Sequence, residues 1–394
     1  MTTRQLKLGY FVLEGLNSFA ATFYLYYLFF FLRSQFGFDN RDNLVVGALN
    51  GFVYMCMALT AGKVAQRIGY LVSLRSGLMV TTVALAIGLG LHSVAGQLAV
   101  MLLWTVGITF TWPALEAVVS QGESPVDLPR TLGIYNMVWA GTNALAYFCG
   151  GALQEALGPQ SLFWLPMVIN VAEIGLILYL QRVQSAGVTP VTAPSAHAHG
   201  TPKLTPRPIA RTRKFLRLAW VANPFAYVAI YMLIAVMPGV AGRLHLSPKW
   251  AGCFGSIWLF SRLLAFWWLW RWDGWHYRFR WFLVAYLLLI AGFLVMLVGQ
   301  GWLLIAVAQL GFGIGLGLIY YSSLFYSMDV GEDHGEHGGI HEAAIGIGIF
   351  AGPAVGALSL RLFPGSPDSG TWAVGSLLVC GLFTVLAMER RRAR

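Results

Sequence analysis

Charged side chains are scarce in this sequence. They make up 11% of its 394 residues, whereas about a quarter of the residues in a soluble globular domain are charged. Hydrophobic residues reach 57%, and the mean hydropathy is +0.66. This balance excludes most water-soluble enzymes and favours a protein whose helices cross a membrane several times.

Cysteine is scarce as well. The four cysteines, Cys56, Cys149, Cys253 and Cys380, are far apart in the sequence, and each lies in an apolar stretch. This spacing fits neither a disulfide framework nor a zinc motif. We interpret them as packing residues.

Two motifs of enzymes are missing from the sequence. There is no glycine-rich P-loop to cradle phosphates, which argues against ATP hydrolysis by this chain, and no Ser, His and Asp constellation can be identified. We therefore predict that the protein is not an enzyme and uses no cofactor.

Long apolar segments fill most of the chain. A bilayer core about 30 Å thick requires roughly 20 apolar residues per helix. Twelve segments come close to this length: 9–32, 44–62, 74–95, 98–119, 132–157, 161–180, 216–238, 249–270, 281–299, 302–327, 342–363 and 371–388. The predicted fold class is an all-α polytopic membrane protein with twelve transmembrane helices.

The longest polar stretch lies between the sixth and seventh segments and is rich in Pro, Ala, Thr and His. It has the composition of a linker. The sequence therefore predicts a six-helix bundle over 1–181, a cytoplasmic linker over 182–214 and a second six-helix bundle over 215–394.

Basic residues gather on one side of the predicted membrane. If both termini face the cytoplasm, most Lys and Arg residues fall in cytoplasmic segments, as the positive-inside rule requires. This asymmetry explains the formal net charge of +10 without any nucleic acid. We predict a multi-pass, monomeric protein of the inner (plasma) membrane with both termini in the cytoplasm.

The loop between the second and third segments carries a specific pattern. It reads Gly62-Lys63-Val64-Ala65-Gln66-Arg67-Ile68-Gly69, followed by Arg75. With the plan of six plus six helices, this pattern resembles the loop signature of the major facilitator superfamily, although Gln66 stands where the family usually has Asp. Gly352-Pro353 with Gly356 also resembles the Gly-Pro element of antiporters in this family. The resemblance implies two pseudo-symmetric bundles that rock about a central site and so expose it alternately to each side.

Charges inside the predicted segments are few: Glu14, Glu116, Glu173, Arg262 and Glu342. Each costs about 3 kcal/mol or more in hydrocarbon, so each should face the bundle interior or a wet cavity. The resemblance implies that segments one, four, seven and ten line the cavity, which makes Glu14 and Glu116 candidates for proton coupling. The alternative is that these two carboxyls brace helix ends, paired with Arg130 or a loop amide.

Arg262 points to the substrate. A guanidinium presents a planar fork of donors that suits a carboxylate or a phosphate, so Arg262 predicts an anionic or zwitterionic solute. Trp258 lies one turn earlier on the same face and could form an aromatic wall. The alternative is a permanent buried ion pair between Arg262 and one of the glutamates.

Polar and aromatic side chains recur at helical spacing elsewhere. Such stripes are typical of sites for organic molecules, and also of helix interfaces in membranes. As a set they favour a ring-bearing or amphipathic solute over a small inorganic ion. The predicted substrate-binding residues are Arg262, Trp258, Asn17, Trp112, Trp139, Asn143, Tyr227, Tyr231, Tyr320 and Tyr54.

The segment from Asp329 to Glu342 combines acidic residues with His334, His337 and His341. The histidine spacing suits a metal only if the segment is helical. Its four glycines argue against a helix, so we predict a solvated acidic loop without a metal site.

These features together predict a secondary active transporter that moves a small organic solute by alternating access, coupled to protons. Two alternatives stay open: a lipid or lysolipid flippase of the same fold, and a non-transporting membrane sensor or intramembrane enzyme. The expected partners are the solute, protons and the lipid bilayer.

Overall fold

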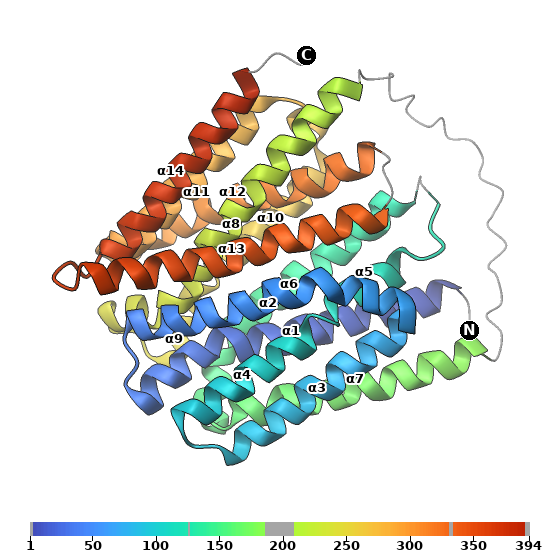
Figure 1. The fold of residues 1–394 in the computed structure, drawn as a ribbon, viewed down its shortest axis with the longest axis horizontal. Helices are drawn as coiled ribbons and strands as arrows, with labels where there is room; N and C mark the ends of the chain where they lie inside the picture. Colours follow the sequence, from blue (N-terminus) through green and yellow to red (C-terminus); the bar gives the residue numbers. More distant parts are fainter. Residues whose placement is uncertain (1–2, 125–126, 186–208, 331–333, 391–394) are drawn as a thin grey trace.

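The computed structural model describes residues 3–124, 127–185, 209–330 and 334–390; for 3–4, 209–210, 328–330 and 334–343 it describes only the backbone. Nearly all of this described chain is helical, and it contains no strand. The helices pack lengthwise against one another (Figure 1).

The helices of the first half of the described chain are α1 (Thr3–Phe36), α2 (Asn40–Ile68), α3 (Tyr70–Gly90), α4 (Val94–Ile108), α5 (Trp112–Ser120), α6 (Leu128–Leu157) and α7 (Ser161–Ser185). Those of the second half are α8 (Ile209–Arg243), α9 (Pro248–Gly255), α10 (Ile257–Arg271), the short 3-10 helix η1 (Asp273–Trp275), α11 (Phe279–Val298), α12 (Trp302–Val330), α13 (His334–Leu362) and α14 (Ser369–Arg390).

Two of the predicted spans are broken helices. In the fourth span, α5 restarts after Thr111, and Pro113 in its first turn needs no hydrogen-bond partner for a backbone N–H. In the eighth span, Ser256 separates α9 from α10, and its hydroxyl donates to the Cys253 carbonyl at 2.9 Å. Each broken pair makes one crossing.

Eleven stretches of the described residues are long and apolar enough to cross a membrane. The twelfth crossing is α6, which is more polar but has 30 residues and is therefore about 45 Å long. The described helices thus make twelve crossings, and the predicted fold class is confirmed.

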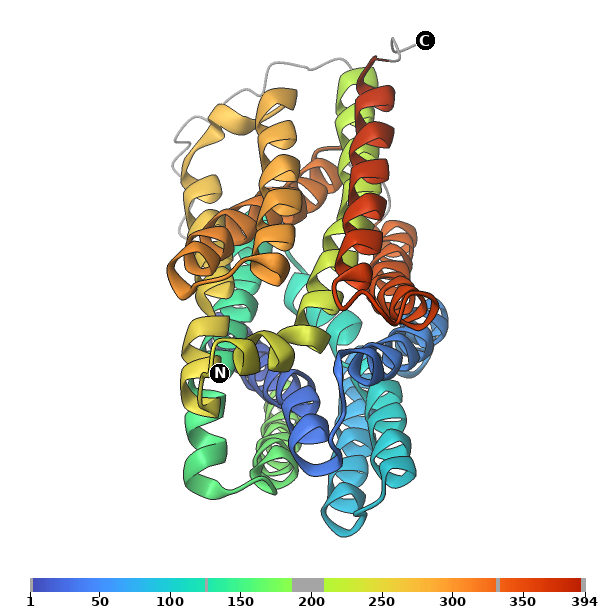
Figure 2. The same ribbon diagram turned by 90° about the vertical axis from the view of Figure 1, so that its left-hand side faces the viewer.

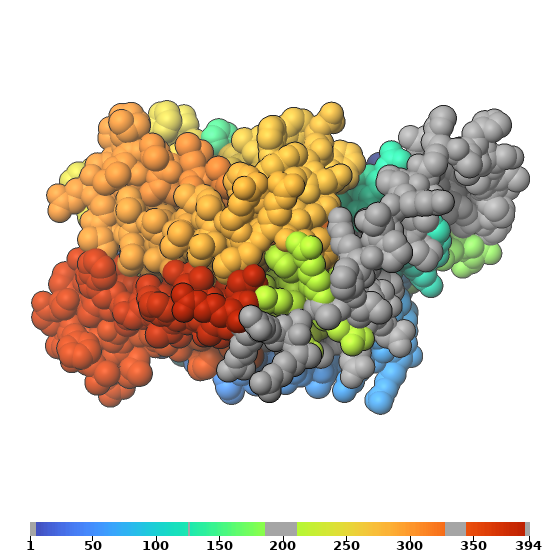
Figure 3. Space-filling view, turned by 90° about the horizontal axis from the view of Figure 1, so that it is seen from above, coloured from blue at the N-terminus to red at the C-terminus, as the bar shows by residue number. Residues whose placement is uncertain are grey.

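The two halves of the chain form two groups of helices. Figure 2 shows α1–α7 below and α8–α14 above, with α9 reaching down to the first group. Along the seam between the groups, α13 lies against α2, and α9 and α10 lie against α6. The face seen in Figure 3 is formed mostly by helices of the second half.

Glycines bring backbones into contact across this seam. A Cβ atom on Gly151 of α6 would collide with the carbonyl oxygen of Pro248, and one on Gly51 of α2 would meet the backbone of Ile349. Beside the first contact, the backbone N–H of Lys249 donates to Glu155 Oε1 at 2.8 Å. At these two contacts the halves are packed backbone to backbone.

One residue makes the turn between α2 and α3. Gly69 has φ +93°, which favours glycine because it lacks a Cβ, and its N–H donates to the Ala65 carbonyl at 2.9 Å. This turn closes the loop whose sequence resembles the family signature.

The start of α13 corrects one prediction. The segment expected to be a solvated loop is helical from His334, eight residues before the predicted span. Each residue added to an existing helix gains a hydrogen bond, and over this segment that gain outweighs the cost of about 1 kcal/mol per glycine. The histidine side chains of this segment lie outside the described residues, so the metal prediction is not tested there.

Candidate substrate and proton sites

Three carboxyl groups from different helices lie near one another in the first half: Glu14 of α1, Glu116 of α5 and Glu173 of α7. Glu14 is fully buried, and its Oε1 accepts a hydrogen bond from Ser18 Oγ at 2.6 Å. It interacts electrostatically with both of the other carboxyls. We call Glu14, Glu116 and Glu173 the carboxyl cluster.

The members of this cluster differ in their surroundings. Glu116 is exposed, whereas Glu173 is fully buried and neither of its carboxyl oxygens has a hydrogen-bond partner. Tyr135 of α6 lies within electrostatic reach of both Glu14 and Glu116. Since Glu116 interacts with Glu14 of α1 and with Tyr135 of α6, it is on the side of α5 that faces these two helices.

The predicted alternative for these carboxyls is a bracing role, paired with Arg130 or a loop amide. Among the described residues, ion pairs join Lys7 to Glu123, Arg41 to Asp42 and Lys214 to Glu389. Within the described chain neither Glu14 nor Glu116 belongs to an ion pair, so the bracing contact with Arg130 is not formed.

Arg262 of α10 is buried where the second half meets the first. Only 4% of its surface is exposed, and its Nε and Nη2 are buried without a hydrogen-bond partner. No carboxylate of the described residues pairs with it. The predicted alternative of a permanent ion pair with a glutamate is therefore not formed in this structure.

Aromatic rings surround this guanidinium. Its Cζ lies 4.4 Å from the ring centre of Trp139 and 5.4 Å from that of Trp258, within cation–π distance. Four tyrosines from α1, α8 and α12 interact with it electrostatically: Tyr26, Tyr227, Tyr231 and Tyr320. We call Arg262, the two tryptophans and these four tyrosines the arginine site.

One face of α6 connects the carboxyl cluster to the arginine site. Tyr135 and Trp139 are four residues apart and so lie on the same face of the helix. Tyr135 faces the carboxyls and Trp139 contacts Arg262. Tyr320 of α12 stacks on Trp139 with ring centres 5.3 Å apart and also interacts with Tyr135. The two sites therefore adjoin across the seam.

Asn143 continues this face of α6 and holds Trp139 in place. With its amide oxygen accepting from Trp139 Nε1 at 3.1 Å, its amide nitrogen donates to Thr22 Oγ1 at 2.7 Å and to the Ser18 carbonyl at 3.1 Å. Asn143 thus ties the indole ring to α1.

The other predicted residues occupy two places. Tyr54 and Trp112 have ring centres 6.5 Å apart and belong to an apolar cluster that also includes Tyr227 and Tyr231, so they extend the aromatic surroundings of the arginine site. Asn17 is 2% exposed, and its amide nitrogen is buried without a partner.

Sequence reasoning missed Tyr26, Tyr135 and Ser18. Tyr135 could have been found by extending the stripe of Trp139 and Asn143 by one turn. Tyr26 lies in a run of aromatic residues in which no periodicity distinguishes one ring from its neighbours.

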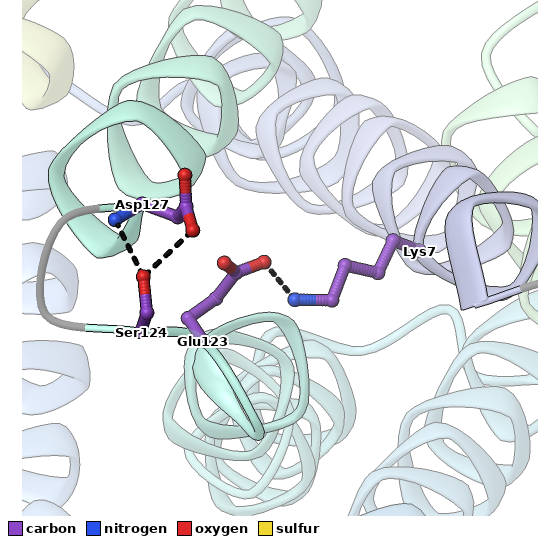
Figure 4. Close-up of polar contacts among 4 residues, drawn as sticks. All are labelled: Lys7, Glu123, Ser124 and Asp127. Carbon is purple, nitrogen blue, oxygen red and sulfur yellow. Dashed lines mark hydrogen bonds and ion pairs between the residues drawn. The ribbon is translucent and has the colours of Figure 1, made fainter. Parts of the chain in front are cut away.

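A further polar contact lies where α1 begins. Lys7 forms an ion pair with Glu123, beside a hydrogen bond of 2.6 Å from Ser124 Oγ to Asp127 (Figure 4). This contact ties α1 to the connection between α5 and α6.

No group of three or more metal-ligating side chains is found among the described residues.

The fold and its enclosed polar groups are those of a polytopic membrane transporter. The chain belongs to the Major Facilitator Superfamily, whose family model matches residues 15–353, and this confirms the predicted resemblance. Members of this family are transporters rather than enzymes. Among curated protein sequences, none matches this chain.

Solved structures share the fold at low sequence identity. The nucleoside transporter NupG is 14% identical with a TM-score of 0.68, and the match covers 98% of this chain and 100% of that one. The human organic anion transporter MFSD10 (TETRAN) is 16% identical with a TM-score of 0.65, covering 97% and 99%. A structure from work on substrate recognition in proton dependent oligopeptide transporters is 16% identical with a TM-score of 0.70, covering 98% and 99%.

Proposed function

We propose that this protein is a secondary active transporter that moves a small organic anion or zwitterion across the membrane by alternating access, driven by protons. The observation that carries the proposal is Arg262, a buried cation at the seam with two unpaired donors. A buried charge without a partner costs several kcal/mol, so a structure retains it where a ligand can compensate it. In a transporter the solute supplies the opposite charge.

The carboxyl cluster supports proton coupling. Glu14 is shielded from water, whereas Glu116 is exposed, so a proton could pass between the surrounding solution and a buried carboxyl. Glu14 and Glu116 are the proposed proton carriers. Tyr135 and Tyr320 provide a short connection from these carboxyls to Arg262, through which the protonation state could affect solute binding.

The names of two neighbours agree with this proposal. One of these proteins is described as an organic anion transporter, and another structure concerns proton dependent oligopeptide transporters.

We further propose that the two moving bundles are residues 1–181 and 215–394, joined by a linker over 182–214. The proposed setting is the inner (plasma) membrane, with both termini in the cytoplasm and the chain acting as a monomer.

The rival functions have less support. An intramembrane enzyme would bring the glutamates and Arg262 together as one catalytic cluster, but no ion pair joins them among the described residues. A flippase requires a path open sideways to the lipid, and none of the residues assembled above favours one.

Uptake and counterflow in proteoliposomes with an imposed pH gradient test the proposal. Organic anions, amphiphilic amines and lysolipids are the solutes to screen. We expect anion accumulation that follows the gradient in the wild type and is lost in Glu14→Gln or Glu116→Gln. Asp368→Asn, a carboxyl between α13 and α14 that belongs to neither site, is the control. If both cluster variants still accumulate solute, neither carboxyl is the proton carrier.

A further inference from the structure

The two unpaired nitrogens of Arg262 define one edge of its guanidinium. The N–H of Nε and one N–H of Nη2 point in the same direction, and a pair of oxygens on one planar group can accept both in parallel. Both atoms are buried and lack partners, whereas Nη1 is not among the buried unpaired atoms. What Arg262 lacks is therefore a ligand with two adjacent oxygens.

The charge around this edge limits the ligand further. Arg262 is a single positive charge, and no carboxylate of the described residues forms an ion pair with it. A ligand with one negative charge makes the site neutral. A phosphate dianion would leave one uncompensated negative charge among buried rings, which costs several kcal/mol.

The surroundings of the edge are aromatic. Tyr227 and Tyr231 stack on the same face of α8 with ring centres 6.4 Å apart, and Tyr54 and Trp112 pack in the same apolar cluster. Rings of this kind favour contact with another ring in offset or edge-to-face geometry. A ligand that carries a ring next to its charged group can use both parts of the site.

We propose that the solute is an aromatic monocarboxylate whose carboxylate binds side-on to Nε and Nη2 of Arg262 while its ring packs against Tyr227 and Tyr231. This inference rests on the proposed function, because it assigns the solute class of the same transporter. It is narrower, since it specifies one planar carboxylate and excludes phosphate groups and cations.

Calorimetric titration of the purified full-length protein in detergent tests the ligand chemistry. The probes are benzoate, phenylacetate and 3-phenylpropionate, with phenylacetamide as the uncharged match and benzylphosphonate at pH 8 as the dianion. We expect at least one carboxylate to bind, with its amide and phosphonate counterparts each at least about 30-fold weaker, as loss of a charged bidentate contact requires. The proposal is overturned if no carboxylate binds, if phenylacetamide binds as tightly as phenylacetate, or if the phosphonate binds as tightly as the carboxylate.

Substitutions test the geometry of the contact. Arg262→Lys keeps the positive charge but removes the parallel donors, so we expect phenylacetate to bind at least about 10-fold more weakly. Arg243→Lys is the matched control, because the Arg243 guanidinium donates to the Leu297 carbonyl at 2.7 Å, away from the site. Unchanged affinity in Arg262→Lys overturns the side-on contact. If the Arg262→Lys variant does not fold, the comparison of carboxylate, amide and phosphonate binding to the wild type still tests the proposed ligand class.

The binding and transport experiments test the ligand class and the transport function separately. If carboxylates bind in detergent but are not moved in proteoliposomes, the ligand class stands and the proposed transport function falls. If proteoliposomes accumulate a solute that carries no carboxylate, and carboxylates neither bind nor compete with it, the transport function stands and the ligand class falls.

Discussion

The carboxyl cluster and the arginine site each place an ionisable side chain in the interior of the bundle, but these side chains differ in what their charge can do. A carboxyl can take up or release a proton, whereas a guanidinium keeps its charge at any physiological pH. The carboxyls lie on α1, α5 and α7 in the first half, and Arg262 lies on α10 in the second. The group that can change its charge suits the driving ion, and the group that cannot suits the solute.

Both sites contain buried polar atoms without a hydrogen-bond partner, but the unpaired atoms are acceptors in one and donors in the other. Glu14 accepts a hydrogen bond at one carboxyl oxygen from Ser18 of its own helix, although its other oxygen is buried without a partner. Arg262 has rings around it but no acceptor for two of its nitrogens. An unpaired carboxyl oxygen can be compensated by a proton, whereas the free donors of Arg262 require the acceptor oxygens of another molecule.

The largest predicted effect is that of substituting Arg262, and it should separate solute binding from proton coupling. Arg262→Gln removes the charge that holds the solute, so counterflow exchange and gradient-driven accumulation should both fall about 100-fold. Glu14→Gln removes only the proton carrier, so exchange should stay near the wild-type rate while accumulation is lost. Both quantities are measured in proteoliposomes with and without a pH gradient. Equal loss of exchange in the two variants would show that the two regions do not have separate roles.

The next effect concerns the contact that holds the two halves together. Gly151→Ala places a methyl group against the Pro248 carbonyl, and overpacking of this kind costs about 1–3 kcal/mol. We expect a lower unfolding temperature in detergent, with the arginine site weakened along with the seam. Gly62→Ala is the control, since nothing lies within 4 Å of its added Cβ. A Gly151→Ala protein as stable as the control would mean that this seam is not closely packed.

Hydropathy was sufficient to predict the fold. Burying apolar side chains in lipid is a property of each segment alone, so all twelve crossings could be located before their packing was known. The breaks at Thr111 and Ser256 were missed, although Pro113 and the glycines of α9 are signals of interruption. The helix at His334 was missed because intrinsic propensity, taken residue by residue, neglects the cooperativity of an adjoining helix.

The candidate site was predicted only in part, because it is made by two halves that meet. Arg262 and the glutamates are conspicuous as charges in apolar segments, and that signal requires no structure. The contact of Arg262 with Trp139 joins residues of different halves, so helical spacing could not reveal it. Tyr26 and Tyr135 became visible only when α1, α6 and α10 were placed together.

A smaller effect is expected at the residue that supports Trp139. Asn143→Ala removes the acceptor of the indole N–H and the link to Thr22, so Trp139 can shift away from Arg262. We expect the half-saturating solute concentration for exchange to rise about 10-fold, equivalent to about 1.4 kcal/mol. Asn136→Ala is the matched control, because Asn136 donates to the Leu132 carbonyl within α6 at 2.8 Å. If the two variants bind solute equally well, Asn143 does not position the ring.

The smallest effect is expected at the ion pair that ties α1 to the connection before α6. Lys7 and Glu123 have side chains 19% and 13% exposed, and pairs near the surface contribute about 0–1 kcal/mol. Glu123→Gln should therefore lower the unfolding temperature slightly, and added salt should shrink the difference, since salt screens exposed charges. Exchange should not change, because this pair belongs to neither site. A large loss of accumulation with exchange intact would instead place Glu123 on the proton path and extend the carboxyl cluster to the end of the bundle.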